Sequence, residues 1–202
     1  MKRLVLKKAS SLICGMVFTS LLFLTSCVGI QGNGNIVSQE RAASDFQGLT
    51  LSGVANINIH PGEAYKVEVT TDDNLQDFIS VESKNGVLHI GTKDNENLRP
   101  TKLIVDVYLP ELQSINLSGV GNVTLPNGNA SNLKISLSGV GNIDAQNYQV
   151  QNITVQNSGV GNAKLWATDS LSGAISGVGN ISYKGDPEVN IKVSGVGKVK
   201  KI

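Results

Sequence analysis

One pentapeptide recurs along the chain at nearly constant spacing. Ser-Gly-Val-Gly-Asn begins at residues 118, 138, 158 and 176, and a fifth copy that begins at 194 ends in lysine. An early copy, Ser52–Asn56, has alanine in place of the second glycine. A repeat of 18–20 residues is long enough for one circuit of a solenoid, in which each coil pairs with the next. The repeats are therefore predicted to stack as coils.

Each copy of the pentapeptide lies between two short stretches of alternating apolar residues. Counting its serine as zero, positions −3, −1 and +5 are mostly aliphatic, as in Ile115, Leu117 and Val123. A period of two is typical of half-buried strands, and paired coils would lie ~4.8 Å apart. The aliphatic positions are predicted to face one another inside the stack.

The pentapeptide itself is predicted to form a sharp corner, because glycine tolerates the positive φ that such corners need. The valine between the glycines is expected to plug the corner from inside. The asparagines are expected to hydrogen-bond from coil to coil as a ladder. The residues assigned to corner and ladder are Asn56, Gly119, Gly121, Asn122, Gly139, Gly141, Asn142, Gly159, Gly161, Asn162, Gly177, Gly179 and Asn180.

Residues 36–111 are predicted to form an irregular β portion that contains a hairpin. Asn85-Gly86 between two short apolar runs favours a hairpin with a type I′ turn. Nothing longer than a single turn, over Asp72–Phe78, indicates a helix. Because the early SGVAN copy lies in this portion and the SGVGN coils occupy 112–202, we predict one all-β domain over 36–202.

The first 27 residues have the pattern of an export signal. A basic start, Met1–Lys8, precedes the apolar stretch Leu12–Leu24, which is shorter than the ~20 residues that span a membrane. The following Leu-Thr-Ser-Cys resembles the bacterial lipobox, in which cleavage leaves the cysteine at the new N-terminus with attached lipid. We predict a lipoprotein signal peptide over 1–26, then the lipidated Cys27 and a flexible tether over 27–35.

Charge and cysteine content exclude several classes of protein. Of the 17 basic residues, four lie in the first 27, so 13 basic and 16 acidic residues remain, a net charge of about −3. This near-neutral balance predicts no nucleic-acid partner. The chain has two cysteines, Cys14 in the apolar stretch and Cys27. The domain therefore has neither a disulfide nor a thiolate metal site.

No cofactor or metal is predicted at the glycine repeats. A phosphate loop needs Gly-Lys-Ser/Thr opening a helix, whereas strand-like residues follow each Gly-Val-Gly. A calcium-binding nonapeptide repeat needs an aspartate where these repeats have asparagine. Asp72, Asp73 and Asp77 supply too few of the six to eight oxygens that calcium takes, and are expected to be solvated.

Catalysis is not predicted, because no clear pair of acids falls on one face of the coils. Asp169 and Asp186 have offsets that would make them neighbours on adjacent coils, while His60 and His89 are isolated and expected on strands.

An aromatic pair is a candidate ligand surface. Trp166 and Tyr148 of the preceding coil can stack on a sugar ring, and sealing of a loop edge is the alternative.

Several of these motifs occur together in one known family. The stretches are FQGLTLSGVANINIHPGEAYKVEV, ISVESKNGVLHIGTK, KLIVDVYLPELQSINLSGVGNV and the tandem SGVGNI copies, after a lipobox. In this order they resemble the head GIN-domain family, described as auto-transporter adhesins, over Asp45–Ile202. The resemblance implies a right-handed parallel β-helix with a hairpin-bearing N-terminal part, exported to the cell envelope. It supplies no catalytic residue, and its adhesin name rests on analogy of fold.

We therefore expect a non-catalytic, lipid-anchored envelope protein whose solenoid surface serves adhesion or scaffolding. The partners would be the membrane, through the lipid, and a glycan or an envelope or host protein. A periplasm-facing protein-binding module and a carbohydrate-active β-helix enzyme are the alternatives. The expected location is the outer membrane; its face stays open, because residues 28–35 lack the acids that often follow the cysteine of surface-exported lipoproteins.

The lysines of the C-terminal GKVKKI are expected to protect the edge of the last coil. A homo-oligomer formed through that end is the alternative.

Overall fold

The computed structural model describes residues 29–202, so the predicted signal peptide and Cys27 lie outside the described residues. Within this range the chain is all-β, as predicted, with two short 3₁₀ helices. No helix in this range is long and apolar enough to cross a membrane. Fifteen strands form one sheet, and β1 and β8 form a second.

The strands fall into an N-terminal group and a group made by the repeats. The first comprises β1 (Ile30–Gln31), β2 (Ile36–Arg41), β3 (Gly48–Leu51), β4 (Asn56–Pro61), β5 (Lys66–Asp72), β6 (Ile79–Lys84), β7 (Val87–Thr92), β8 (Leu98–Arg99) and β9 (Leu103–Leu109), with helices η1 (Asp73–Phe78) and η2 (Lys93–Asn95). The second comprises β10 (Ser114–Leu117), β11 (Val123–Thr124), β12 (Gly128–Leu137), β13 (Ile143–Asn157), β14 (Ala163–Ile175), β15 (Ile181–Lys184), β16 (Glu188–Val193) and β17 (Val199–Lys201).

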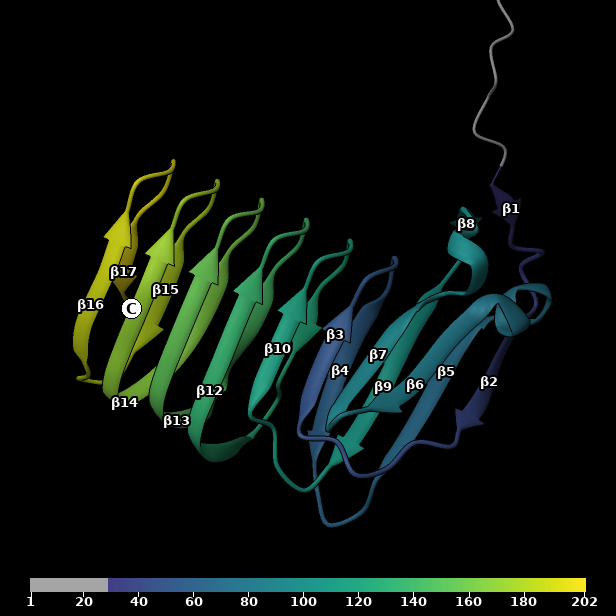
Figure 1. Cartoon of the computed structure of the whole chain (residues 1–202), viewed down its shortest axis with the longest axis horizontal. Helices are drawn as coiled ribbons and strands as arrows, with labels where there is room; N and C mark the ends of the chain where they lie inside the picture. Colours follow the sequence, from purple (N-terminus) through teal and green to yellow (C-terminus); the bar gives the residue numbers. More distant parts are fainter. Residues whose placement is uncertain (1–28) are drawn as a thin grey trace, which may run out of the picture.

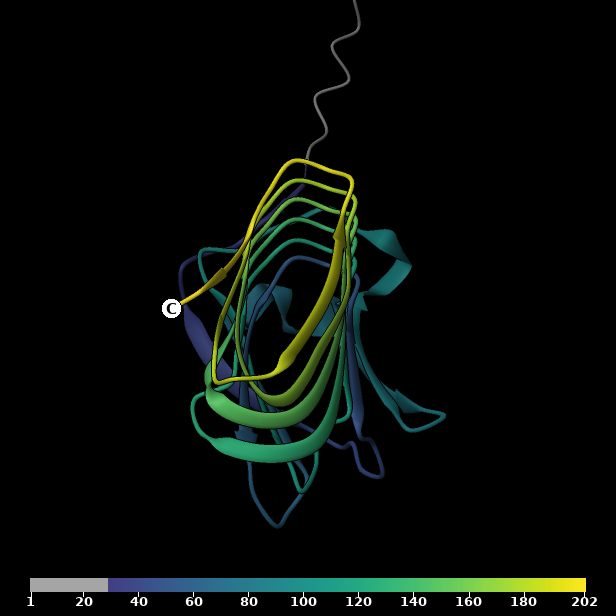
Figure 2. The same cartoon turned by 90° about the vertical axis from the view of Figure 1, so that its left-hand side faces the viewer.

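Successive repeats pair in parallel, so that equivalent residues lie side by side through the stack (Figure 1). Ile115 pairs with Ile135, and Ile135 with Val155. The end-on view shows coils of similar outline one behind another (Figure 2). The change from 20 to 18 residues per repeat is absorbed as register shifts between Asp144 and Asn152 of β13. The repeat spacing therefore sets the pairing register, with a local adjustment at one turn.

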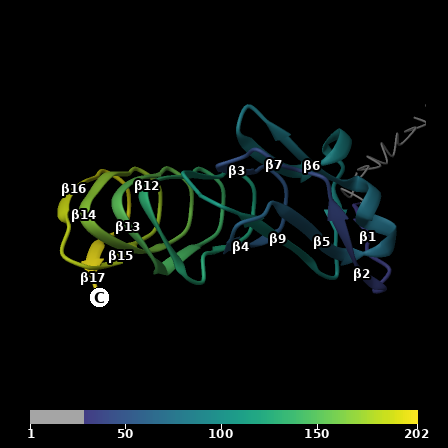
Figure 3. The ribbon, with the colours of Figure 1, turned by 90° about the horizontal axis from the view of Figure 1, so that it is seen from below.

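Each coil has two flat sides, which are seen from below in Figure 3. We call them the β16 side and the β17 side. The β16 side contains β6, β7, β3, β10, β12, the second halves of β13 and β14, and β16. The β17 side contains β2, β5, β9, β4, β11, the first halves of β13 and β14, β15 and β17. The SGVGN corners join the two sides along one edge of the stack.

The sheet is mixed, whereas a parallel β-helix was expected. β5 pairs antiparallel with β2 and β9, and β6 pairs antiparallel with β7. The tight turn at Asn85 and Gly86, whose φ values are +53° and +75°, reverses the chain between β6 and β7. This is the predicted hairpin, and such a short turn can join only antiparallel strands. The antiparallel strands lie at the N-terminal end of the stack.

One aliphatic core fills the space between the two sides. Leu51, Leu117 and Ile135 are all less than 2% exposed, and the predicted inward positions supply most of the core. The last coil differs, because no coil stacks beyond it. Val189 and Val193 of β16 are 40% and 42% exposed. The stack is therefore open at its C-terminal end.

The segment predicted as a flexible tether is held against the fold from Gly29 onward. β1 pairs with β8, and the backbone N–H of Gly32 donates to the carbonyl oxygen of Arg99 at 3.0 Å. Only residues 27 and 28 of the predicted tether lie outside the described range. A short glycine-rich sequence therefore does not make this segment a flexible tether, because β8 supplies hydrogen-bond partners for its backbone.

The corner positions require glycine, because adjacent coils approach too closely there for a side chain. A Cβ on Gly121 would lie 1.7 Å from the carbonyl oxygen of Ala55, and one on Gly119 would lie 2.0 Å from that of Gly53. In the four SGVGN copies only the second glycine has a positive φ, which is +150° at Gly121. The corner is still hydrogen-bonded, since the N–H of Val120 donates to Gly53 at 2.9 Å.

Replacing Gly121 with alanine should destabilise the fold by about 3 kcal/mol, because the new Cβ meets a backbone oxygen and the φ is strained. The free energy of unfolding in urea measures the effect. Gly62→Ala is the control, since no atom lies within 4 Å of its Cβ position, and should change stability by less than about 1 kcal/mol. Equal stability of the two variants would contradict the close approach of the coils.

Candidate functional site

The valines of the repeats form an exposed row along the corner edge, at the top of the stack in Figure 1. We call it the valine ridge. Five of its members are 47–50% exposed, and the last is 70% exposed. Each is bridged in parallel to the next along the stack. The ridge comprises Val54, Val120, Val140, Val160, Val178 and Val196.

The prediction that these valines plug the corners from inside is wrong. The alternation of inward and outward residues continues through the corner without a break. Leu117 and Val123 are buried, so Val120, an odd number of positions from each, faces outward. Gly119 and Gly121 occupy the inward positions, where the two sides of the coil converge. The corner therefore exposes an aliphatic side chain on every coil.

An asparagine row lies beside the valine ridge and is hydrogen-bonded along its length. The side-chain oxygen of Asn56 accepts from the side-chain nitrogen of Asn122 at 3.0 Å and from its backbone N–H at 3.2 Å. The same two bonds recur at the next three steps, with distances of 2.9–3.1 Å. At the last step the oxygen of Asn180 accepts from the backbone N–H of Lys198. The row comprises Asn56, Asn122, Asn142, Asn162 and Asn180.

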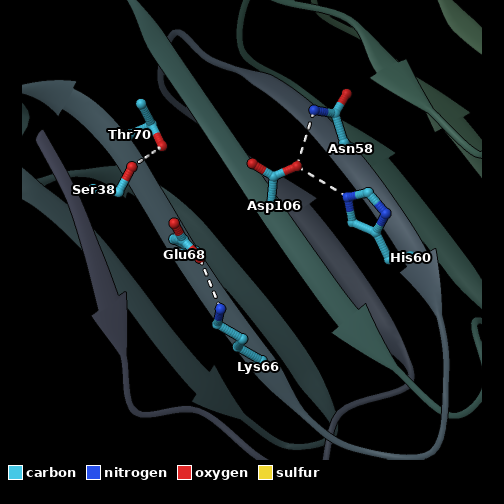
Figure 4. Close-up of polar contacts among 7 residues, drawn as sticks. All are labelled: Ser38, Asn58, His60, Lys66, Glu68, Thr70 and Asp106. Atoms are coloured by element: carbon cyan, nitrogen blue, oxygen red, sulfur yellow. Dashed lines mark hydrogen bonds and ion pairs between the residues drawn. The ribbon is translucent and has the colours of Figure 1, made fainter. Parts of the chain in front are cut away.

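A polar cluster that the sequence analysis did not identify lies on the β17 side (Figure 4). Asp106 of β9 accepts a hydrogen bond from Asn58 at 3.0 Å and pairs with Nε2 of His60 at 2.9 Å. The His60 ring stacks on Tyr108, with 4.5 Å between centroids. No group of three His, Cys, Asp or Glu side chains within 29–202 could hold a metal ion. Cross-strand contacts of this kind stabilise the pairing of β4 with β9.

The predicted aromatic surface is not formed. Tyr148 is 1% exposed, and burial raises the pKa of its hydroxyl. A buried ring cannot stack on a sugar. Trp166 is partly buried, and the Lys184 ammonium lies 3.9 Å from the centre of its ring. The two aromatic residues therefore belong to the core and to a cation–π contact, respectively.

The two aspartates weighed as an acid pair each have a separate partner. Asp169 accepts a hydrogen bond from Thr168 at 2.8 Å, and Asp186 pairs with Lys201. Of the two histidines expected to be isolated, His60 is not, since it contacts Asp106, whereas His89 is exposed on β7. These residues do not assemble into a common site.

Of the three acids considered for calcium, Asp72 at the end of β5 and Asp73 at the start of η1 fasten the N-terminal segment to the fold. Asp72 is fully buried, although it was expected to be solvated, and accepts from the N–H groups of Gly34 at 2.7 Å and Thr101 at 2.8 Å. Burial favours a raised pKa for Asp72, but these backbone bonds outweigh it and lower the pKa. Asp73 accepts from the amide of Asn35 at 2.7 Å, which lowers its pKa. We call this arrangement the aspartate latch.

These findings define an all-β protein of stacked coils with rows of identical side chains on its surface. A sequence model of the family described as "Putative auto-transporter adhesin, head GIN domain" matches residues 45–127 and 118–187. The matched residues make up more than half of the chain, which therefore belongs to this family.

Two solved structures resemble the chain over most of its length. One is a protein described as a putative adhesin from Bacteroides fragilis NCTC 9343, which is 25% identical, with a TM-score of 0.62 over 86% of this chain and 100% of that chain. The other is described as a putative lipid binding protein from Parabacteroides distasonis ATCC 8503, also 25% identical, with a TM-score of 0.54 over 86% of this chain and 99% of that chain. No curated protein matches the chain at a significant level.

Replacing Asn122 with leucine should lower the free energy of unfolding by about 1–3 kcal/mol, because two N–H groups of Asn142 lose their acceptor. Asn129→Leu is the matched control, since Asn129 is exposed and outside the row, and should cost less than about 0.5 kcal/mol. Thermal and urea unfolding of both variants measure the difference. Equal costs would mean that the row contributes nothing to stability.

The aspartate latch should weaken in acid. A lowered folded-state pKa stabilises the fold above the unfolded pKa of about 4, and this contribution is lost as pH falls through the lower folded value. The stability difference between the wild type and Asp72→Asn should therefore be large at neutral pH and shrink below about pH 4. Urea unfolding across this range measures it, with the exposed Asp77→Asn as control. A difference that does not vary with pH would exclude an ionised latch.

Proposed function

We propose that the chain is a non-catalytic, lipid-anchored protein of the cell envelope that uses the valine ridge of its β-solenoid for adhesion. The observation that carries this proposal is the ridge itself, six aliphatic side chains that are about half exposed or more. A contiguous exposed apolar strip is unusual on a soluble protein and typical of an interaction surface. Membership of a family described as adhesins supports the same function.

The ridge suits multivalent attachment. Its valines recur at ~4.8 Å, the spacing of paired strands, on a backbone that is hydrogen-bonded through every corner. A partner surface would therefore meet several equal contacts in a fixed geometry. Each contact is weak, and their number supplies the affinity.

The position of the N-terminal segment supports anchoring from one end. β1 lies at the N-terminal end of the stack, opposite β16 and β17 (Figure 1). A lipid on Cys27 would hold the protein by this end and direct the stack away from the membrane. The aspartate latch would keep the anchor close to the domain, since Gly34 and Asn35 are bonded to it.

Substituting two central members of the ridge, Val140→Lys and Val160→Lys, should reduce adherence about thirtyfold, because each half-exposed valine contributes roughly 1 kcal/mol of apolar contact. The measurement is retention of cells that produce the full-length chain on mucin and on extracellular-matrix proteins. Gln151→Lys with Gln156→Lys is the control, since both glutamines are exposed on another part of the same repeat. An equal loss in the control would contradict a role for the ridge.

Protease treatment of intact cells tests the location on which this function depends. A C-terminal epitope should be lost before the outer membrane is opened. Loss only after opening would mean that the ridge faces the periplasm, and adhesion would then be the wrong function.

A further inference from the structure

A groove of about 610 Å³ crosses the C-terminal coils on the β17 side. This volume is within the range of small-molecule sites. Its lining comes from β13, β14, β15 and β17 and from the asparagine row beside them. The groove therefore runs along the axis of the stack, across the strands rather than beside one of them.

The groove is predominantly cationic. Lys164, Lys198 and Lys200 line it and are exposed, and none of them forms an ion pair with any residue in the described range. Asp144 is the single acid in its lining, and one of its oxygens already accepts the backbone N–H of Gln146. A chain whose domain carries a slight net negative charge thus gathers unpaired ammonium groups here.

The asparagine row offers donors rather than acceptors to this groove. Asn142 and Asn162 line it, and each side-chain oxygen accepts two hydrogen bonds from the next coil. A carbonyl oxygen has two lone pairs, so both are used. Each side-chain NH₂ donates one hydrogen to the preceding coil and has a second that bonds to nothing in the described structure. Amide donors beside ammonium groups suit a ligand with many acceptor oxygens and negative charge.

We propose that the groove binds a linear acidic polysaccharide through its carboxylate or sulfate groups. Lys164 pairs in register with Ser182, and Ser182 with Lys200, so the two lysines lie two coils apart. This separation is roughly 10 Å. Anionic groups that recur at this distance along a sugar chain would meet both ammonium groups, and sugar hydroxyls would accept from the amides between them.

A peptide fits this groove less well, because the inner strands beneath it, β14 and β15, are paired on both sides and have no free backbone groups to offer. The N–H of Ala163 donates to the carbonyl of Asn180, and the N–H of Ile181 donates to that of Lys198, both at 2.9 Å. An acidic peptide lying across these strands could not extend the sheet. Recognition across these strands depends on side chains, and such side chains can bind the carboxylate or sulfate groups and hydroxyls of an acidic polysaccharide.

The site is limited to the C-terminal coils by a reversal of charge along the same strip. In the strand register Lys164 lies opposite Asp144, and farther toward the N-terminal end the equivalent outward positions hold Asp106 and Glu68. A polyanion would be repelled there. The bound segment should therefore span about two coil spacings, or roughly 10 Å.

This inference goes beyond the proposed function, because the groove and the valine ridge use different side chains. Adherence through the ridge can persist without acidic-glycan binding, and the reverse also holds. The valine variants therefore test adhesion through the ridge, and the lysine variants test glycan binding in the groove, so that one proposal can fail without the other.

The test is binding of the full chain to polygalacturonate and to dextran sulfate, measured by titration calorimetry at low and moderate salt. Methyl-esterified polygalacturonate and uncharged dextran have the same backbones without the charge. We expect binding to at least one acidic polymer, weaker at higher salt, and none to the neutral polymers. Lys164→Gln with Lys200→Gln should weaken binding by roughly tenfold.

The control is Lys134→Gln with Lys192→Gln, which removes the same charge from exposed positions on the β16 side. It should change the affinity by less than about twofold. An equal loss in this control would overturn the proposal in favour of non-specific charge attraction. The proposal is also overturned by binding to neither acidic polymer, by equal binding to the neutral polymers, or by tighter binding to polyglutamate than to any polysaccharide.

Discussion

The close contact between each corner glycine and the coil before it is the constraint on which the structure depends. The Cβ position of Gly121 lies 1.7 Å from a carbonyl oxygen of the preceding coil, so only glycine lets the backbones approach. Hydrogen bonds then continue through the corner, as from Val120 to Gly53. Because the spacing of the coils is set by the backbone, every outward position becomes a straight row. The valine ridge, the asparagine row and the lysines of the groove are consequences of this one contact.

Much of the fold could be predicted because the repeat carries its own register. The spacing of the pentapeptide places Ile115 beside Ile135, and the alternation of apolar residues identifies the core. The prediction that the corner valine points inward was wrong because the alternation of inward and outward residues continues through the corner. Even the exception in the first copy has a physical reason. Within residues 29–202 the isolated bridge of Val54 is to Val120, on its C-terminal side, so no earlier copy of the corner packs against Ala55, and alanine is tolerated where later copies need glycine.

The polar features were harder to predict, because they join segments that are distant in sequence. Asp72 bonds to Gly34 and Thr101, and nothing in the sequence around Asp72 indicates such partners. His60 and Asp106 can each be placed on an outer face by alternation, but their contact depends on the parallel pairing of β4 with β9. The spacing of the repeats predicts which residues lie side by side on adjacent coils, whereas the irregular N-terminal strands carry no such spacing. The groove was missed for a related reason, since its lysines come from different repeats and share a row only after the coils are stacked.

A rigid surface of fixed period selects its ligand in a way that a flexible surface does not. The coils cannot change their spacing without breaking backbone hydrogen bonds, so a ligand with a different repeat drifts out of register after a few contacts. Matching contacts lose little conformational entropy on binding, because the rows are held in place beforehand. In the proposed function the apolar ridge would tolerate many partners, since burial of valine has no directional requirement. The proposed binding in the groove would be more selective, because ammonium and amide donors need acceptors at particular positions. Under the two proposals, adjacent strips of one stack would therefore combine tolerant attachment with selective recognition.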